Sequence, residues 1–255
     1  MASTPASAPT VSTVDLSGQA LPGMSPGLNG VLAVPAGDGP WPAVVMVHEA
    51  FGLTDVMKRQ VDRMAAAGFL VLMPDLFVDG GPRRCLRATF TAISAGHGRV
   101  FVDVEAARAY LVGRGDCTGK VGVLGFCMGG GFALVAASGH GFDAASSNYG
   151  RLPSELDEAF SGACPIVGSY GGRDNSLRGA AAKLDAALTT RDVPHDVKEY
   201  PTAGHSFLND APTGPKIFRP LFSAILGAGP DPEAAADAWK RIDAFFREHL
   251  ASGAA

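Results

Sequence analysis

Residues 121–131 read VGVLGFCMGGG. This stretch is an apolar run of strand type that leads into a turn crowded with glycine and then into a helix. The turn has the form G-x-C-x-G, with Gly125 and Gly129 two residues either side of Cys127. In the serine version of this turn, the glycines let neighbouring backbones pack closely, and the strained turn lifts the nucleophile off the carboxyl edge of a sheet. We therefore expect Cys127 at the N-terminus of a helix, which favours a thiolate; the alternative is a small buried hydrophobe in a glycine-rich turn.

The sequence on both sides of this turn alternates short apolar runs with longer segments of helical spacing. This alternation is typical of a parallel sheet wrapped by helices. The predicted strands are Val11–Leu16, Gly30–Val34, Ala43–His48, Leu70–Met73, Val121–Gly125, Ala144–Tyr149, Pro165–Tyr170 and Val197–Tyr200, and the predicted helices are Asp55–Ala67, Val102–Gly113, Met128–Ser138, Leu177–Thr190 and Glu233–Leu250. The fold class is therefore α/β, with a mostly parallel central sheet of about eight strands and helices on both faces.

Two segments do not fit the alternation. Residues 77–99 hold four arginines among Gly, Thr and Ser, and we interpret them as a lid or binding loop, or equally as a solvated surface excursion. Residues 209–229 are a second candidate flap. Residues 1–10 are small, polar and interrupted by proline, so they predict a disordered leader that is not a secretory signal. No internal linker or repeat divides residues 11–255, which are predicted to form a single domain.

An acid and a histidine follow the cysteine in the chain order that this type of turn requires. Asp174 comes directly after the predicted strand that ends at Tyr170, and His205 comes shortly after the strand that ends at Tyr200. In a triad, Asp174 would orient the ring of His205, and His205 would take the proton from Cys127. The alternatives are an aspartate that caps the next helix and an ordinary loop histidine.

The loop after the strand Ala43–His48 provides the second oxyanion donor in this type of fold. We assign that donor to the backbone N–H of Ala50 and pair it with the N–H of Met128. Glu49 would then lie beside Cys127, where a carboxylate opposes thiolate formation unless it exchanges a proton with the thiol or pairs with a cation. The alternative is that Glu49 points to solvent.

Composition excludes several function classes. The chain has 255 residues, 47% of them hydrophobic and 18% charged, and a formal net charge of −4. Without a clustered stripe of Lys and Arg, these values argue against a nucleic-acid or membrane-surface partner, and no run approaches the roughly 18 apolar residues of a membrane helix. The four cysteines form no C-x-x-C pair, so no metal is indicated. We expect a cytoplasmic monomer or small homo-oligomer that acts on a small molecule without a metal or organic cofactor.

Taken together, these motifs resemble the dienelactone hydrolase (carboxymethylenebutenolidase) family of α/β-hydrolases. The segments that carry the resemblance are HEAFG (48–52), PDL (74–76), GFCMGG (125–130), GGRD (171–174) and GHSF (204–207). The resemblance implies an α/β-hydrolase fold and hydrolysis of a carboxylic ester or lactone through a cysteinyl acyl-enzyme. It implies that Cys127 is the nucleophile, His205 the base, Asp174 the orienting acid, and Glu49 the partner that keeps the thiol quiet until substrate arrives.

The sequence departs from the family at the substrate site. Dienelactone-specific members hold the substrate carboxylate with two arginines, one of them four residues after the catalytic histidine, where this chain has Asn209. Arg84 or Arg87 could match the other arginine. An amide cannot recognise a carboxylate as a guanidinium does, so the reaction type is better supported than dienelactone itself. The candidate substrate-binding residues are Phe51, Arg84, Arg87, Phe207 and Asn209.

Two other functions remain open from the sequence. The first is a generalist carboxylesterase or thioesterase whose pocket is shaped by the lid segment, residues 77–99. The second, from a different class, is a thiol-based redox sensor on a hydrolase scaffold, in which Cys127 responds to an oxidant. A redox role would not require Asp174 and His205 at triad positions, so hydrolysis is the favoured interpretation.

Overall fold

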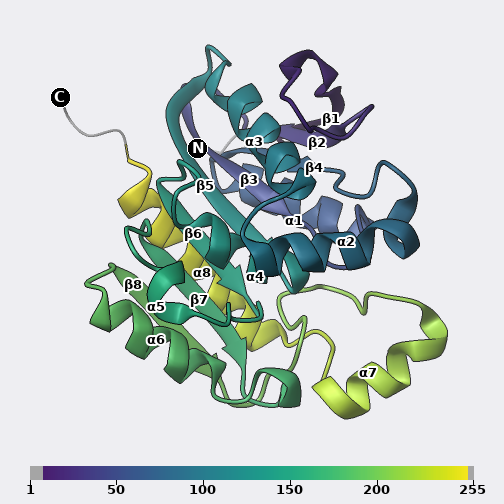
Figure 1. Cartoon of the computed structure of the whole chain (residues 1–255), viewed down its shortest axis with the longest axis vertical. Helices are drawn as coiled ribbons and strands as arrows, with labels where there is room; N and C mark the ends of the chain where they lie inside the picture. Colours follow the sequence, from purple (N-terminus) through teal and green to yellow (C-terminus); the bar gives the residue numbers. More distant parts are fainter. Residues whose placement is uncertain (1–7, 252–255) are drawn as a thin grey trace, which may run out of the picture.

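A computed structural model describes residues 8–251. Eight strands form one sheet in the order β1-β2-β4-β3-β5-β6-β7-β8 (Figure 1). The pairs β1/β2 and β2/β4 are antiparallel, and all the other pairs are parallel. The strands are β1 (Thr10–Asp15), β2 (Asn29–Val34), β3 (Trp41–Val47), β4 (Leu70–Pro74), β5 (Cys117–Phe126), β6 (Ala144–Asn148), β7 (Ile166–Gly171) and β8 (His195–Tyr200). The sheet confirms the predicted class and all eight predicted strands.

Helices cover both faces of this sheet. They are α1 (Asp55–Ala66), α2 (Gly81–Ala95), α3 (Arg99–Val112), α4 (Met128–Ala136), α5 (Leu156–Ala159), α6 (Ala180–Thr190), α7 (Arg219–Leu226) and α8 (Pro232–His249). One apolar core contains the buried sides of α1 and α8, and the other contains those of α3, α4 and α6. These five helices thus bury apolar side chains against the sheet, whereas α7 has no buried residue. Among the residues from 8 to 251, no helix is both long and apolar enough to span a membrane.

The strand order places a topological switch point beside β3. The chain passes from β3 through α1 to β4 on one side, and then returns through α3 to β5 on the other side of β3. Ligands of open α/β sheets bind outside the carboxyl ends of strands at such a point. The loops that leave β3 and β5 here begin with His48 and Cys127.

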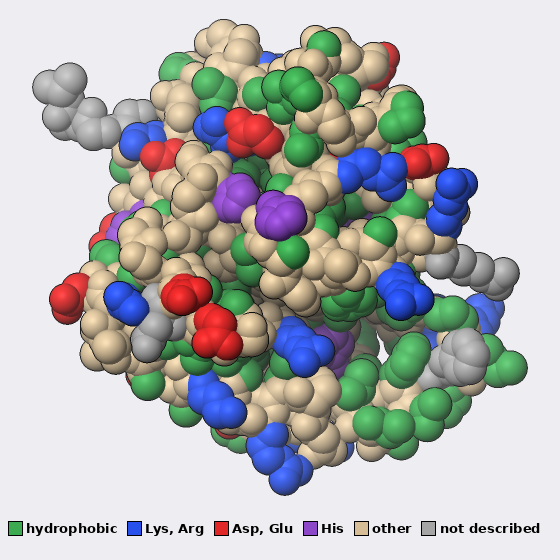
Figure 2. Space-filling model, in the orientation of Figure 1, with side chains coloured by type: hydrophobic (Ala, Val, Ile, Leu, Met, Phe, Trp, Pro, Cys, Tyr) green, Lys and Arg blue, Asp and Glu red, His purple; other side chains and the backbone are tan. Residues whose placement is uncertain are grey.

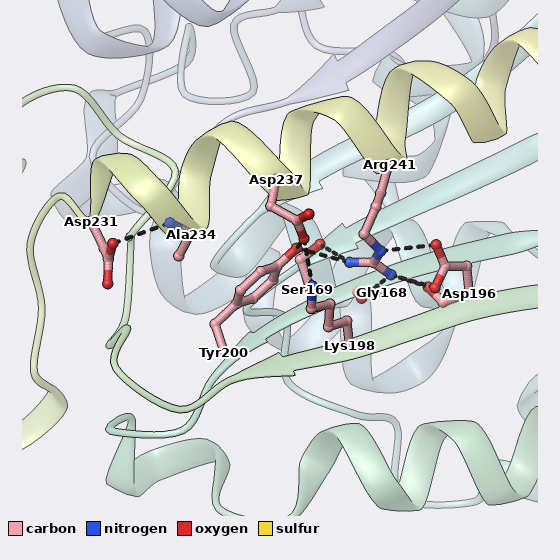
Figure 3. A network of polar contacts seen from close by, with 9 residues as sticks. All are labelled: Gly168, Ser169, Asp196, Lys198, Tyr200, Asp231, Ala234, Asp237 and Arg241. Carbon is pink, nitrogen blue, oxygen red and sulfur yellow. Dashed lines mark hydrogen bonds and ion pairs between the residues drawn. The ribbon is translucent and has the colours of Figure 1, made fainter.

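Helix α8 is attached to the strands at the other end of the sheet by a polar network (Figure 3). The guanidinium of Arg241 donates to the side chain of Asp196 at 2.9 Å, to the carbonyl of Asp196 at 2.8 Å and to the hydroxyl of Tyr200 at 3.1 Å. Asp231 caps the helix by accepting from the N–H of Ala234 at 3.1 Å. These contacts fix the start of α8 close to the loop that follows β8.

The structure corrects the prediction in two places. The predicted lid, residues 77–99, is not an irregular loop: most of it is helix α2, which begins beside Pro82 and ends before Gly96. The second candidate flap, residues 209–229, contains helix α7. Of the predicted leader, residues 1–7 lie outside the described residues, and Thr10 is already the first residue of β1.

Candidate active site

Cys127 lies at the sharp turn between β5 and α4. Its φ of 54° and ψ of −112° are strained for a residue with a side chain. A Cβ atom at Gly125 would lie 1.8 Å from the carbonyl oxygen of Gly129, and a Cβ at Gly129 would lie 2.2 Å from that of Val47. Both glycines are therefore required by close backbone approach, as the sequence predicts.

The neighbouring strand β6 supports this turn. The backbone N–H of Cys127 donates to the carbonyl of Asn148 at 3.0 Å, and the amide of Asn148 donates to the carbonyl of Gly125 at 3.2 Å. Within residues 8–251, the backbone N–H groups of Met128 and Ala50 donate to no protein group. Both donors are thus available for the oxyanion role that the sequence predicts for them.

Asp174 and His205 meet at the carboxyl ends of β7 and β8. The carboxylate of Asp174 is fully buried and accepts from Nδ1 of His205 at 2.6 Å. Its other oxygen accepts from the backbone N–H and the hydroxyl of Ser176, at 3.0 and 2.6 Å. Asp174 therefore caps a short 3-10 helix and also holds one ring nitrogen of His205, and its role in a triad stays a prediction.

The electrostatics of this group favour a charged imidazole. Burial lowers the pKa of His205, but the negative charge of Cys127 and the hydrogen bond to Asp174 outweigh burial and raise the pKa to about 10. Burial raises the pKa of Asp174, and the hydrogen bond from His205 more than compensates, so the pKa is lowered overall. Since Nδ1 of His205 is bound to Asp174, Nε2 is the ring nitrogen left for Cys127.

Backbone hydrogen bonds hold the loop that carries His205. The N–H of His205 donates to the carbonyl of Leu226 at 3.0 Å, and its own carbonyl accepts from the N–H of Gly229 at 3.1 Å. A Cβ at Gly204 would lie 2.1 Å from the carbonyl oxygen of Gly227. The histidine loop is therefore packed directly against the connection between α7 and α8.

Glu49 is buried and does not point to solvent. Its Oε1 accepts from the amide of Asn209 at 2.9 Å, whereas Oε2 has no hydrogen-bond partner among the described residues. The buried imidazole of His48 fixes the peptide beside it, since Nδ1 lies 2.7 Å from the carbonyl oxygen of Glu49 and Nε2 accepts from the N–H of Leu76 at 3.2 Å. A carboxylate with one unused oxygen thus lines the same cavity as Cys127.

Sequence reasoning missed Tyr149 at the end of β6. Its ring lies 5.1 Å from the ring of His205, and its buried hydroxyl has no hydrogen-bond partner in the described chain. Burial raises the pKa of Tyr149 well above its usual range, and the charges of Glu49 and Cys127 raise it further, so the phenol is neutral. Its position after a central strand was the available signal, because the carboxyl ends of parallel strands share one edge.

Two cavities open on either side of Cys127 and His205. The smaller one, of about 200 Å³, is bounded by the β3–α1 loop and by the segment from Ala211 to Gly229, including α7. The larger one, of about 970 Å³, is bounded by the end of α2, by α4 and by the segment from Arg151 to Ala159. In the space-filling view the surface is hollowed between the body of the protein and the largely apolar α7 region (Figure 2).

The predicted substrate-binding residues are only partly brought together. Phe51 lines the smaller cavity, and Asn209 lies behind it, bound to Glu49. Phe207 is fully buried against the rings of Tyr149 and Tyr200 and lines neither cavity. Arg84 and Arg87 are exposed on α2, away from both cavities. Among residues 8–251, no group of three or more His, Cys, Asp or Glu side chains could hold a metal ion.

Comparison of the sequence with known proteins assigns the chain to a family. The model of the dienelactone hydrolase family matches residues 28–250. A protein of Methylorubrum extorquens named "Putative carboxymethylenebutenolidase" is 30% identical over 234 residues, which cover 85% of this chain and 75% of the relative.

Solved structures agree at the level of the fold. The dienelactone hydrolase of Anabaena variabilis gives a TM-score of 0.69 at 22% identity and covers 96% of this chain and 100% of its own. A dienelactone hydrolase-like promiscuous phosphotriesterase from metagenomic libraries gives a TM-score of 0.72 at 23% identity over 95% of this chain and 99% of its own. These likenesses confirm the predicted α/β-hydrolase fold. The chain therefore belongs to the dienelactone hydrolase family of ester and lactone hydrolases.

Proposed function

We propose that the protein hydrolyses a carboxylic ester or lactone through a Cys127-His205-Asp174 triad and a cysteinyl acyl-enzyme. The observation that carries this proposal is the 2.6 Å contact between Asp174 and His205 beside a cysteine at a strained turn. Interactions with Cys127 and Asp174 raise the pKa of His205 to about 10, and a charged imidazole beside a cysteine favours the thiolate. A thiolate is the reactive form of a cysteine nucleophile.

The reaction then proceeds in two halves. The Cys127 thiolate attacks the substrate carbonyl carbon, and the resulting oxyanion accepts hydrogen bonds from the N–H groups of Ala50 and Met128. Collapse of this intermediate breaks the carbon–oxygen bond, and the imidazolium of His205 gives its proton to the departing alkoxide. In the second half, His205 takes a proton from water, the hydroxide attacks the thioester, and the acid is released as the thiolate is restored.

Glu49 is proposed as the alternative proton site of the thiol. Among residues 8–251 its buried Oε2 has no hydrogen-bond partner, and Glu49 lines the cavity of Cys127. A proton shared between this oxygen and the sulfur would remove one of the two negative charges, carboxylate and thiolate, which repel each other in a buried site. Asn209 keeps the carboxylate in place through Oε1 and leaves the unpaired oxygen as the one available to the thiol.

The test compares the wild type with Cys127→Ser and Cys164→Ser on a dienelactone, a neutral lactone, p-nitrophenyl acetate and a short thioester. We expect Cys127→Ser alone to lose turnover, and we expect a mass increase equal to one acyl group on the wild type when it is quenched during turnover. Cys164 is the control because it lines neither cavity. Equal hydrolysis by all three proteins, or none by the wild type, would contradict the proposal.

The ranking within this panel separates the two kinds of hydrolase. A preference for the carboxylate-bearing dienelactone requires an available cationic partner, and Asn209 is neutral and already bound to Glu49. Of the arginines that line the cavities, Arg219 donates to the carbonyl of Gly214, and Arg151 shares its wall with two carboxylates, those of Glu155 and Glu158. We therefore expect the neutral substrates to be cleaved at least as well as the dienelactone. A large preference for dienelactone over the neutral lactone would refute this expectation and leave the triad intact.

A further inference from the structure

The two cavities beside the triad differ in size, and of the lining residues that the structure describes they share Cys127 and His205 alone. A substrate carbonyl at Cys127 has one substituent on each side, the acyl chain and the leaving alcohol. Ala50, one candidate oxyanion donor, borders the smaller cavity, and Met128, the other, borders the larger one. The carbonyl therefore lies at the junction, with its two substituents directed into different cavities.

The smaller cavity suits a compact apolar group. At about 200 Å³ it lies below the usual range of about 300–1,000 Å³ for small-molecule sites. Apolar side chains form most of its wall, and the rings of Phe51 and Phe222 lie beside each other in that wall, tilted at 41° with 6.4 Å between their centroids. A chain longer than a few carbons would meet these rings.

The larger cavity suits a bulky polar group. Its volume of about 970 Å³ lies at the upper end of the usual range. Apolar side chains such as Phe90, Ile93 and Leu152 form much of its wall, and the rest carries serine hydroxyls and charged groups: Ser94, Arg151, Ser154, Glu155, Glu158 and Ser176. Two carboxylates and one guanidinium disfavour an anionic ligand, and the mixed wall suits an uncharged ligand with both apolar and hydrogen-bonding groups.

The order of the reaction assigns the acyl group to the smaller cavity. After the first half-reaction, the acyl group stays on Cys127 while the alcohol leaves and water reaches the thioester. The larger cavity has room for a bulky alcohol to leave and for water to approach His205 on the same side. A compact apolar acyl group in the smaller cavity would block neither path.

We propose that the substrate is an ester of a short aliphatic acid with a larger, uncharged polar alcohol, the acyl chain occupying the smaller cavity and the alcohol the larger one. This proposal rests on the proposed function of Cys127. It adds a prediction of which group each cavity holds, so the substrate assignment can fail while the proposed function stands.

The experiment uses substrates that exchange the two halves. We compare kcat/KM for 6-O-acetylglucose with that for methyl gluconate, and for p-nitrophenyl acetate with p-nitrophenyl octanoate. We expect the first member of each pair to be favoured by about tenfold or more, since each misplaced group in a closed apolar pocket costs about that factor. Cys127→Ser is measured with every substrate.

Variants in each cavity test the assignment separately. Phe222→Ala enlarges the smaller cavity and should raise the octanoate-to-acetate ratio by about tenfold, whereas Leu221→Ala, on the exposed side of the same helix, should leave the ratio unchanged. Ser94→Trp narrows the larger cavity and should reduce kcat/KM for 6-O-acetylglucose by about tenfold, with Thr91→Trp on the same helix as control. Thermal denaturation checks that each variant is folded.

Each outcome separates the two proposals. Preference for methyl gluconate, or an octanoate rate equal to the acetate rate, overturns the two-cavity assignment while Cys127-dependent hydrolysis stands. A ratio that responds equally to Phe222→Ala and Leu221→Ala also overturns it. Hydrolysis of no ester by the wild type, or hydrolysis that survives Cys127→Ser, overturns the proposed function and with it the substrate assignment.

Discussion

Replacing Cys127 by serine should lower the pKa of His205. The charge of Cys127 is the largest of the contributions that raise the pKa of His205 to about 10, and serine keeps a hydrogen-bonding group without the charge. At pH 7, a pKa of about 10 leaves roughly one molecule in a thousand with a neutral imidazole. Removal of an opposite charge at contact distance changes a pKa by about 1–3 units, and Asp174 still supports the charged ring. We therefore expect the titration of His205 to move down by about that amount.

The assay is an NMR titration of the histidine ring protons, with His205→Gln used to identify the signal. Burial raises the pKa of Cys164 to about 12, so this thiol is neutral at pH 7 and Cys164→Ser should leave the titration unchanged. A shift of one unit corresponds to about 1.4 kcal/mol of interaction with the protonated ring. If His205 titrates at the same pH in wild type and Cys127→Ser, the thiolate and imidazolium pair does not exist.

Three further outcomes follow from the same geometry. Asp174→Asn should lower kcat by about a hundredfold or more, because the base loses the carboxylate that orients it; a steady-state assay showing less than a fewfold loss would contradict this. Asn209→Leu leaves Oε1 of buried Glu49 unpaired and should reduce the free energy of unfolding by about 1–3 kcal/mol. Urea denaturation measures this loss, and an unchanged midpoint would rule the predicted loss out. Gly125→Ala should cost more than about 3 kcal/mol, since its Cβ would overlap backbone at 1.8 Å. Gly115→Ala, with no atom within 4 Å, should cost under about 0.5 kcal/mol, and equal stability of the two would refute the close-approach argument.

The sequence predicts the strands and the turn at Cys127 because these features depend on local pattern. Apolar runs that are buried on both faces and glycines at a close backbone contact leave a signal within a few residues. The order Cys127, Asp174, His205 also predicts their convergence, since each follows a strand of one parallel sheet. The geometry between Asp174 and His205 agrees with that expectation.

The walls of the cavities could not be predicted in the same way. Helix α2 has a narrow buried side, with Cys85 and Thr89 one turn apart, so its pattern resembles that of a polar loop, although Pro82 near its start and Gly96 at its end were usable signals. The position of Phe207 in the core depends on contacts with Tyr200 on the adjoining strand and with Tyr149, which is distant in the sequence. Such long-range packing is invisible to local periodicity.

The backbone bonds between the histidine loop and the α7–α8 connection have a thermodynamic consequence. Leu226 and Gly229, which exchange these bonds with His205, also form part of the wall of the smaller cavity. A ligand that fills this cavity and restricts the α7–α8 connection therefore also restricts the imidazole of His205. Ligand binding and the restriction of the imidazole are then two equilibria linked by a single coupling free energy. By reciprocity, any substitution that loosens the imidazole weakens retention of an unreactive ligand in the cavity by the same factor.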